Sequence, residues 1–140
     1  MILSDRDIKK VIKEGKLVFK PNLSNDQIGP ASIDLKLGSV FKSFDISKQS
    51  LLDTKRGFPD KKFIISRRLK ENESFILHPT DFVLASTKEY VKVSDDLVLK
   101  MEGKSTLARM GILVHTAGFI DPGFEGTLTL EISNQSDLPV

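Results

Sequence analysis

Short apolar segments separated by turn-forming residues recur along nearly the whole chain. Residues 32–37 alternate strictly between polar and apolar side chains, which predicts a strand with Ile33, Leu35 and Leu37 facing inward and Gly38 at its end. Apolar runs predict further extended segments at residues 17–19, 40–41, 63–65, 75–77, 82–85, 90–93, 97–99, 113–115 and 127–132. Many short strands at close spacing indicate a mostly-β fold.

Helical signals are confined to two places. Ser4 is a predicted N-cap, with Asp7 completing an acidic capping box, and apolar residues follow at helical spacing until Gly15, a natural stop. One or two helical turns are predicted at residues 105–110. The chain is therefore expected to have one short N-terminal helix and little other helix.

The segments between these elements contain no linker, repeat or low-complexity tract. Residues 47–59 are polar and are expected to form a loop, and residues 78–81 to reverse the chain. We therefore expect a single domain over residues 1–140. Because a domain rarely ends soon after a strand begins, we also expect residues beyond Val140 that carry part of a site.

Composition narrows the class of protein. An apolar fraction of 39% in 140 residues is enough for one modest core. Twenty-one lysines and arginines against nineteen acidic residues give no global field, so neither nucleic acid nor a membrane is expected as partner. Cysteine is absent, which removes disulfides and thiolate metal sites and fits a cytoplasmic protein. No apolar run is long enough for a membrane span.

The turn Gly103-Lys104-Ser105-Thr106 places a cation and two hydroxyl groups before a possible helix start. Backbone N–H groups at such a turn bind phosphate well, although an exposed turn with an N-capping serine is the simpler interpretation. It is not a P-loop, because Val98 stands where that motif needs a glycine. Arg109 follows Ser105 by four residues, so one helical turn brings both to one face. The arginine either binds phosphate, orients a carboxylate or is merely exposed.

Two acidic residues near the C-terminal end are further candidates. Asp121 lies in an Asp-Pro-Gly turn and either shapes that loop or accepts hydrogen bonds from a sugar hydroxyl. Glu131 lies on the polar face of residues 127–132. If that face meets solvent, Glu131 is an ordinary surface residue. If it lines a pocket, partial desolvation raises the pKa of Glu131 toward that of a general base.

The chain has two histidines, and neither has the spaced partners of a metal site. His78 precedes a proline in a predicted turn and is expected to be structural. His115 ends an apolar strand and is expected to orient a loop or pack against it.

Six segments, taken in order, resemble the dCTP deaminase family of the dUTPase-like superfamily. They are ILSDRDIKKVIKEGKL, PASIDLKLG, FILHPTDFVLAST, GKSTLAR, HTAGFIDPGFEG and TLTLEISN. The resemblance implies a distorted β-barrel or jelly-roll subunit of the dUTPase-like type with a short N-terminal helix. It also implies a homotrimer, or a hexamer, with active sites shared between subunits.

By position, the resemblance implies a role for each matching residue. The block that binds the triphosphate is matched by Lys104, Ser105, Thr106, Leu107, Ala108 and Arg109. Asp121 matches the residue that holds the deoxyribose 3′-hydroxyl, and Ala117 the backbone that bonds the catalytic water. Thr129 and Leu130 match the backbone that reads the base. Glu131 matches the catalytic glutamate, which Ser105 and Arg109 assist.

The resemblance also implies the reaction. A dCTP deaminase converts dCTP to dUTP and ammonia without zinc, which agrees with a chain that lacks cysteine for a zinc-deaminase site. Magnesium is expected to arrive on the triphosphate. Gly118-Phe119 is similar to the bifunctional members, which continue to dUMP and pyrophosphate and so supply dUMP for thymidylate synthesis.

Two departures from the family pattern keep other functions open. The segment between Arg109 and Asp121 is one residue shorter than expected, near His115-Thr116, where the water is positioned. Residues 1–140 do not include the family's C-terminal lid, with its tyrosine, lysine and glutamine contacts to nucleotide, which we expect beyond Val140. The alternatives are a dUTP diphosphatase that does not deaminate, and a catalytically silent nucleotide-binding regulator on the same fold.

Overall fold

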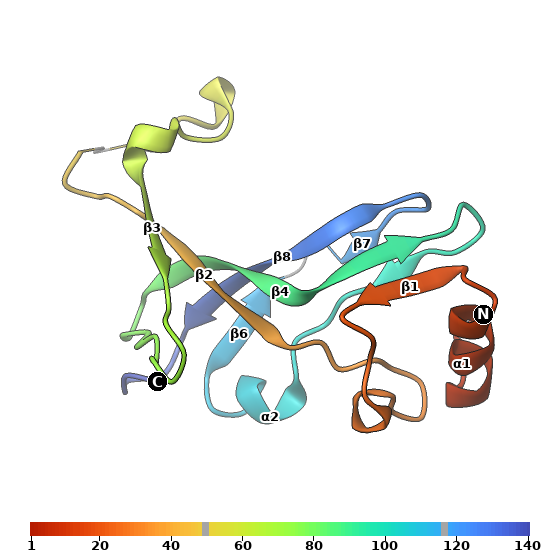
Figure 1. The fold of residues 1–140 in the computed structure, drawn as a ribbon. Helices are drawn as coiled ribbons and strands as arrows, with labels where there is room; N and C mark the ends of the chain where they lie inside the picture. The colour runs from red at the N-terminus through yellow and green to blue at the C-terminus, as the bar shows by residue number, and fades with distance from the viewer. Residues whose placement is uncertain (49–50, 116–117) are drawn as a thin grey trace. The chain divides into compact units, whose positions relative to one another are not determined.

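The computed structural model describes residues 1–48, 51–115 and 118–140 (Figure 1). Its internal contacts divide the chain into two compact units. Unit 1 comprises Met1–Gly38, Ser86–Glu102 and Thr116–Thr129, and unit 2 comprises Ser39–Ala85, Gly103–His115 and Leu130–Val140. Each unit takes three separate stretches of chain, so neither is a contiguous sequence domain. The single-domain assignment for residues 1–140 stays a prediction.

The described elements are mainly antiparallel strands. They are β1 (Leu17–Lys20), β2 (Leu37–Phe44), β3 (Ile64–Arg68), β4 (Phe82–Val93), β5 (Leu99–Lys100), β6 (Ile112–His115), β7 (Phe119–Ile120) and β8 (Glu125–Asn134). A six-stranded sheet has the order β3-β2-β4-β8-β6, with β1 also paired to β4, and β5 pairs with β7. The helices are α1 (Asp5–Lys13), the single turn α2 (Ser105–Ala108) and three 3₁₀ turns, η1 (Asn25–Gln27), η2 (Thr54–Arg56) and η3 (Lys61–Phe63). The mostly-β prediction with a short N-terminal helix is confirmed.

Helix α1 of unit 1 begins and ends close to the predicted residues. Ser4 occupies the N-cap position, but its side chain makes no capping bond to the backbone. The Ser4 hydroxyl instead donates to the Asp7 carboxylate at 3.4 Å, so the predicted capping box is not formed. Gly15 has a φ of 72° and donates its N–H to the Ile12 carbonyl, which ends the helix where the sequence predicts.

The core of unit 1 forms where β1 lies against the C-terminal half of β4. Leu17 pairs with Val93 and Phe19 with Val91 in antiparallel register. These four side chains are buried together with Ile120 and Leu128. Burial alternates along β4, so every odd-numbered residue from Val83 to Val93 is buried. This alternation is what the period of an extended strand dictates for a sheet with one covered face.

The predicted strand at residues 32–37 is wrong. Ile33 forms only an isolated bridge with Ile28, and β2 begins at Leu37, which is exposed. The prediction failed because the backbone in between forms no regular ladder: the Asp34 N–H donates to the Gln27 carbonyl at 2.8 Å, and only the Lys36 carbonyl accepts from a strand, from the Lys88 N–H of β4 at 2.7 Å. Gly38 does not end a strand but lies inside β2, where a Cβ would be 2.8 Å from the Ser86 carbonyl oxygen.

A buried carboxylate organises this irregular segment of unit 1. Glu89 on β4 is only 2% exposed. It accepts a hydrogen bond from the Gln27 side-chain amide at 2.9 Å and another from the Lys36 N–H at 2.9 Å. The Gln27 amide also donates to the Asp34 carbonyl at 2.8 Å. A buried carboxylate without such donors would be costly, so Glu89 and the segment that surrounds it stabilise each other.

Unit 2 is built on the β2–β3 hairpin and on the pairing of β6 with β8. In the hairpin Phe44 lies opposite Ile64 and Val40 opposite Arg68. The core comprises Phe41, Leu77, Val83, Ala85, Ile112 and Ile132. Phe75 stacks on Phe41 with a centroid distance of 4.4 Å, which extends this core toward the surface.

Three other strand predictions need correction. Residues 75–77 form no strand, although Leu77 is buried and its N–H donates to the Val140 carbonyl at 2.7 Å. The two strands predicted at residues 82–85 and 90–93 are one continuous strand, β4, because the polar residues between them alternate in burial as well. The strand predicted at residues 97–99 shrinks to β5, and β7 was not predicted.

The predicted turn at residues 78–81 is confirmed. The Asp81 N–H donates to the His78 carbonyl at 3.1 Å, and the Asp81 carboxylate accepts from the His78 N–H at 3.0 Å. Among the described helices, none is long and apolar enough to span a membrane.

Candidate active site

Strand β8 carries Glu131 as the sequence predicts. Leu128 and Ile132 are buried, Leu130 is half-buried, and Thr127 and Thr129 are exposed. Glu131 itself is half-buried. Its carboxylate makes no hydrogen bond and no ion pair with any residue that the structure describes. A half-buried carboxylate with unoccupied lone pairs can accept a proton from a water molecule.

His115 is the cross-strand neighbour of Glu131. The two residues lie directly opposite each other in the antiparallel pairing of β6 with β8. Residues in such a pair share a face of the sheet, so both side chains leave the sheet on the same side. The His115 ring lies 6.4 Å from the Phe82 ring, centroid to centroid. The ring of His115 thus packs near Phe82 at the start of β4, and not against a loop.

Two polar residues beside this pair were missed by sequence reasoning. Ser133 is buried, and its hydroxyl lies 2.8 Å from Nε2 of His115. The Gln135 amide donates to the same hydroxyl at 3.1 Å. The alternation of β8, continued past Ile132, places Ser133 on the face of Glu131, and this is the signal that would have found it.

The predicted phosphate-binding segment forms a single helical turn in unit 2. Lys104 occupies the N-cap position of α2, one residue before the serine considered in the simpler interpretation. The Arg109 N–H donates to the Ser105 carbonyl at 3.0 Å, and Nε of Arg109 lies 3.4 Å from the same oxygen. Ser105 and Arg109 therefore share one face of the turn, as their spacing predicts. Every residue from Lys104 to Arg109 is exposed.

Strand β6 connects α2 with the glutamate strand. The turn at Gly111 follows α2, and its carbonyl accepts the Gln135 N–H at 2.7 Å, just beyond β8. Gly103, on the other side of α2, lies against β6, since a Cβ there would be 3.4 Å from the Val114 Cβ. No hydrogen bond or ion pair joins Glu131 to Arg109 or Ser105 within the described part of the chain. The positioning role of Arg109 thus stays a prediction.

Asp121 belongs to unit 1 and follows strand β7. Its carbonyl accepts the Phe124 N–H at 3.1 Å, which closes the predicted Asp-Pro-Gly turn, and Gly123 has a φ of 77°. The Asp121 side chain is exposed. It therefore shapes a turn through its backbone and leaves its carboxylate available to a ligand.

The remaining predicted residues flank these groups. Thr129 is exposed in unit 1, and Leu130 packs against the core of unit 2. Ala117 lies outside the described residues, as does Thr116 of the shortened segment. Across residues 1–48, 51–115 and 118–140, no group of three or more histidine, aspartate or glutamate residues is placed to hold a metal ion.

Comparison with a solved structure defines the class of fold. The crystal structure of 2′-deoxycytidine 5′-triphosphate deaminase from Agrobacterium tumefaciens matches 99% of this chain and 43% of that chain, with a TM-score of 0.70 and 24% sequence identity. At this identity the likeness shows the fold, which is that of a dCTP deaminase.

Sequence comparison places the chain within that class. The family model described as dCTP deaminase-like matches residues 2–140, so the chain belongs to this family. The protein of Methanobrevibacter smithii named dCTP deaminase, dUMP-forming, is 47% identical over 140 residues, which cover 99% of this chain and 72% of the relative. The protein of the same name from Dictyoglomus thermophilum is 47% identical over 142 residues, covering 100% of this chain and 73% of the relative.

Proposed function

We propose that the chain is a dCTP deaminase that continues to dUMP. The relatives that bear the name dCTP deaminase, dUMP-forming, support this activity. The proposal rests mainly on Glu131, which is half-buried and lies on the face of β8 shared with His115. Its carboxylate has no hydrogen-bond or ion-pair partner among the described residues. Such a carboxylate is suited to general base catalysis.

In the proposed reaction, the Glu131 carboxylate takes a proton from water as the oxygen attacks C4 of cytosine. Glu131 delivers this proton to N3 of the tetrahedral intermediate, then transfers the proton of the C4 hydroxyl to the amino group, so that the C4–N bond breaks and ammonia leaves. The C4 carbonyl of uracil remains. Arg109 and Ser105 position Glu131 and the phosphates, and the backbone of Ala117 holds the water.

Binding is assigned to the other predicted residues. Asp121 binds the 3′-hydroxyl, and the backbone of Thr129 and Leu130 binds the base. The triphosphate is bound by Lys104, Ser105, Thr106, Leu107, Ala108 and Arg109. In the second step, water attacks the α-phosphorus and pyrophosphate leaves, giving dUMP. The substrate enters as its magnesium complex, in which phosphate oxygens are the principal ligands of the ion.

Product analysis tests this proposal directly. Purified chain is incubated with dCTP or dUTP, and ammonia, dUTP, dUMP and pyrophosphate are resolved over time. The proposal predicts ammonia, dUMP and pyrophosphate from dCTP. Turnover of dUTP alone would favour a diphosphatase, and nucleotide binding without turnover would favour a silent regulator. EDTA should abolish turnover until magnesium is restored, whereas a zinc-selective chelator should have no effect.

We further propose a cytoplasmic homotrimer, or a hexamer of two trimers, with shared sites. The exposure of Asp121 and of all residues from Lys104 to Arg109 supports this, because a second copy could enclose them. Light scattering gives the oligomeric state. Refolding Glu131→Gln together with Asp121→Ala should restore activity that neither variant has alone, if the two residues serve one site from different subunits. An active monomer would contradict the assembly.

A further inference from the structure

The connection between β2 and β3, residues 45–63, is unusually long for a hairpin. The hairpin closes at the pair Phe44 and Ile64, and the described residues of the connection beyond this pair form the turns η2 and η3 and no strand (Figure 1, yellow). Most hairpin connections have two to five residues, and long irregular ones are commonly functional or disordered. This connection contributes nothing to the proposed chemistry, so its size needs another explanation.

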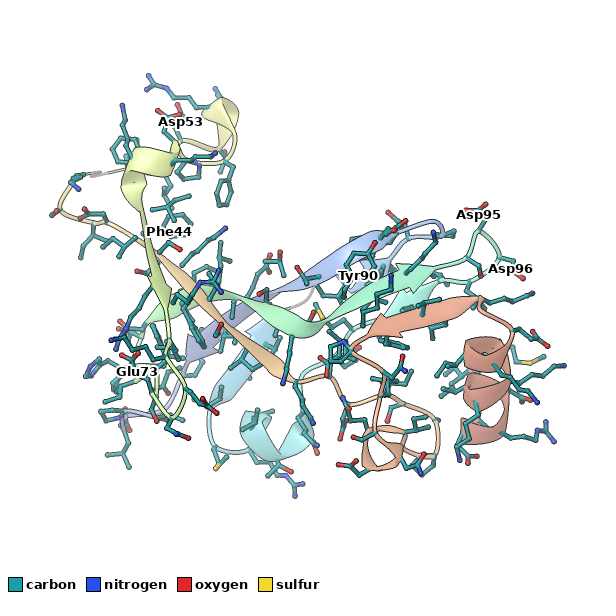
Figure 2. The ribbon with its side chains drawn as sticks, viewed as in Figure 1. Phe44, Asp53, Glu73, Tyr90, Asp95 and Asp96 are labelled. Atoms are coloured by element: carbon teal, nitrogen blue, oxygen red, sulfur yellow. The ribbon has the colours of Figure 1, made fainter. Side chains whose placement is uncertain are left out.

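The connection forms an apolar groove of about 780 Å³. Its apolar lining comprises Phe44, Leu51, Leu52, Phe58, Pro59 and Phe63. The Phe44 and Phe58 rings lie 6.1 Å apart, and Phe44 also stacks on Phe82 of β4 at 6.4 Å, which anchors the groove to unit 2. Figure 2 shows Phe44 at the base of the connection and Asp53 within it.

The groove leaves large apolar side chains in water. Phe58 is 67% exposed, and Leu51 and Leu52 are 73% and 54% exposed. Contiguous exposed apolar side chains with polar residues at their edge are typical of interaction sites. An apolar side chain of a partner would remove this surface from water.

The connection that forms the groove has an excess of basic residues. Residues 45–63 contain five lysines and arginines against three aspartates. All three aspartates are already paired: Asp45 with Lys48 at 2.9 Å, Asp53 with Arg56 at 3.4 Å and Asp60 with Lys62 at 3.6 Å. Lys55 and Lys61 on the turns η2 and η3 form no ion pair with any described residue. They are therefore available to a partner's carboxylates.

We propose that this groove binds an acidic peptide segment of a partner protein, with apolar side chains in the groove and carboxylates against Lys55 and Lys61. A concave apolar surface, with Lys55 and Lys61 next in sequence to its lining residues Arg56 and Asp60, complements such an amphipathic segment in both shape and charge. A flat lipid surface would leave the concavity unfilled.

The test uses the full chain and a labelled synthetic peptide rich in glutamate, with leucine and phenylalanine at helical spacing. Fluorescence anisotropy measures its affinity. Two control peptides replace either the glutamates with lysine or the apolar residues with serine. The acidic apolar peptide should bind at least about tenfold more tightly than either control, because each control removes one of the two complementary features. Equal binding of all three peptides, or binding of none, would overturn the proposal.

Variants of the chain then locate the site. Lys55→Glu with Lys61→Glu should weaken binding at least about tenfold, whereas the charge-matched control Lys9→Glu with Lys13→Glu on α1 should leave it unchanged. Phe58→Ala should also weaken binding, and because Phe58 is mostly exposed its melting temperature should match the parent chain. If both double variants lost the same affinity, the loss would be due to net charge alone, and the groove would not be the binding site.

Three further measurements distinguish other occupants. Single-stranded DNA or anionic lipid vesicles could bind more tightly than the peptide. If Phe58→Ala also weakened that binding, the partner would be a nucleic acid or a membrane and not an acidic peptide. Self-association that disappears in Phe58→Ala would assign the groove to a second copy of the chain. Either outcome would overturn the proposal, and none of these readouts depends on deaminase activity.

Discussion

Two glutamates on neighbouring strands show how surroundings give the same side chain opposite uses. Glu89 of unit 1 is 2% exposed and accepts hydrogen bonds from Gln27 and Lys36. Glu131 of unit 2 is half-buried, and its carboxylate has no hydrogen-bond or ion-pair partner among the described residues. The first carboxylate has its oxygens occupied by protein donors, so it holds structure. The second has carboxylate oxygens without protein donors, so it is available for proton transfer.

Replacing Glu131 should give the largest effect. Glu131→Gln keeps the shape and loses the proton acceptor, so we predict that deamination falls by about 10²–10⁴-fold or more while nucleotide binding persists. The free energy of unfolding should change by less than about 0.5 kcal/mol, as for a substitution that removes no contact. Ammonia release and thermal unfolding measure the two effects. Near-normal deamination would remove Glu131 from the mechanism.

Glu89 should show the reverse pattern. Glu89→Ala leaves the Gln27 amide and the Lys36 N–H without their acceptor, and each unsatisfied buried group costs about 1–3 kcal/mol. Urea unfolding should report this loss, whereas ammonia release per folded molecule should stay close to the parent value. If Glu89→Ala instead abolished turnover at unchanged stability, the distinction between the two glutamates would fail.

Catalysis by Glu131 requires that the substrate be bound by Lys104 and the turn α2. Lys104→Ala should weaken affinity for dCTP by about ten- to a hundredfold, since a charged hydrogen bond contributes about 1.5–3 kcal/mol. Arg109→Ala should lower kcat more than affinity if it positions Glu131. The exposed Lys13→Ala on α1 is the matched control. Unchanged dCTP affinity in Lys104→Ala would refute the phosphate assignment.

A substitution at Gly118 should affect pyrophosphate release and deamination differently. A bulky side chain at position 118 should crowd the α-phosphate, so Gly118→Arg should slow pyrophosphate release more than ammonia release. Gly118 has a φ of 81°, which strains any other residue, so Gly118→Ala provides the control for strain without bulk. Parallel assays of both products decide the matter. If the parent chain stops quantitatively at dUTP, the dUMP-forming step is wrong while deamination stands.

The smallest effect concerns a third, exposed glutamate. Tyr90 on β4 donates its hydroxyl to Glu125, which also pairs with Lys92 at 3.2 Å (Figure 2 labels Tyr90). The hydrogen bond to Glu125 raises the pKa of Tyr90, and the same bond, followed by Lys92, lowers the pKa of Glu125. Tyr90 is the only tyrosine and tryptophan is absent, so ultraviolet titration follows one phenol. Glu125→Gln should lower that pKa, and an unchanged titration would contradict the contact.

The sign of the associated stability changes follows from these directions. The Glu125 interaction contributes above the ordinary carboxyl pKa and is lost as the pH falls through the lowered pKa. The Tyr90 contribution is present below the ordinary phenol pKa and is lost as the pH rises through the raised pKa. Both effects should be small, because the groups are exposed.

Periodicity predicted those parts of the fold in which alternation and backbone pairing agree. Strand β8 is the clearest case, since its polar and apolar faces were assigned correctly as far as Ile132. Residues 32–37 alternate just as strictly, but the Asp34 N–H bonds to the Gln27 carbonyl and the Lys36 N–H to the Glu89 side chain, and only the Lys36 carbonyl accepts a backbone bond from strand β4, from Lys88. The pattern encodes which side chains face the core, and Ile33 and Leu35 do pack against it. It does not encode where the backbone finds its partners.

The candidate site divides along the same line. Ser105 and Arg109 were placed on one face by their spacing, which is a local property. The cross-strand pairing of Glu131 with His115, and the bond from His115 to Ser133, depend on the register between β6 and β8. Register is fixed by contacts across the sheet, so it could not be deduced from either segment alone.

The Glu89 bonds also set an order of events during synthesis. Glu89 lies 62 residues after Gln27 and 53 after Lys36, and β1 likewise finds its partner only in β4. A nascent chain that has released residues 1–38 but not β4 lacks both the acceptor for this segment and the strand that covers β1. Because translation proceeds from the N-terminus at a limited rate, those residues must wait, exposed, until β4 leaves the ribosome. Residues 17–38 therefore become ordered only after β4 has been made.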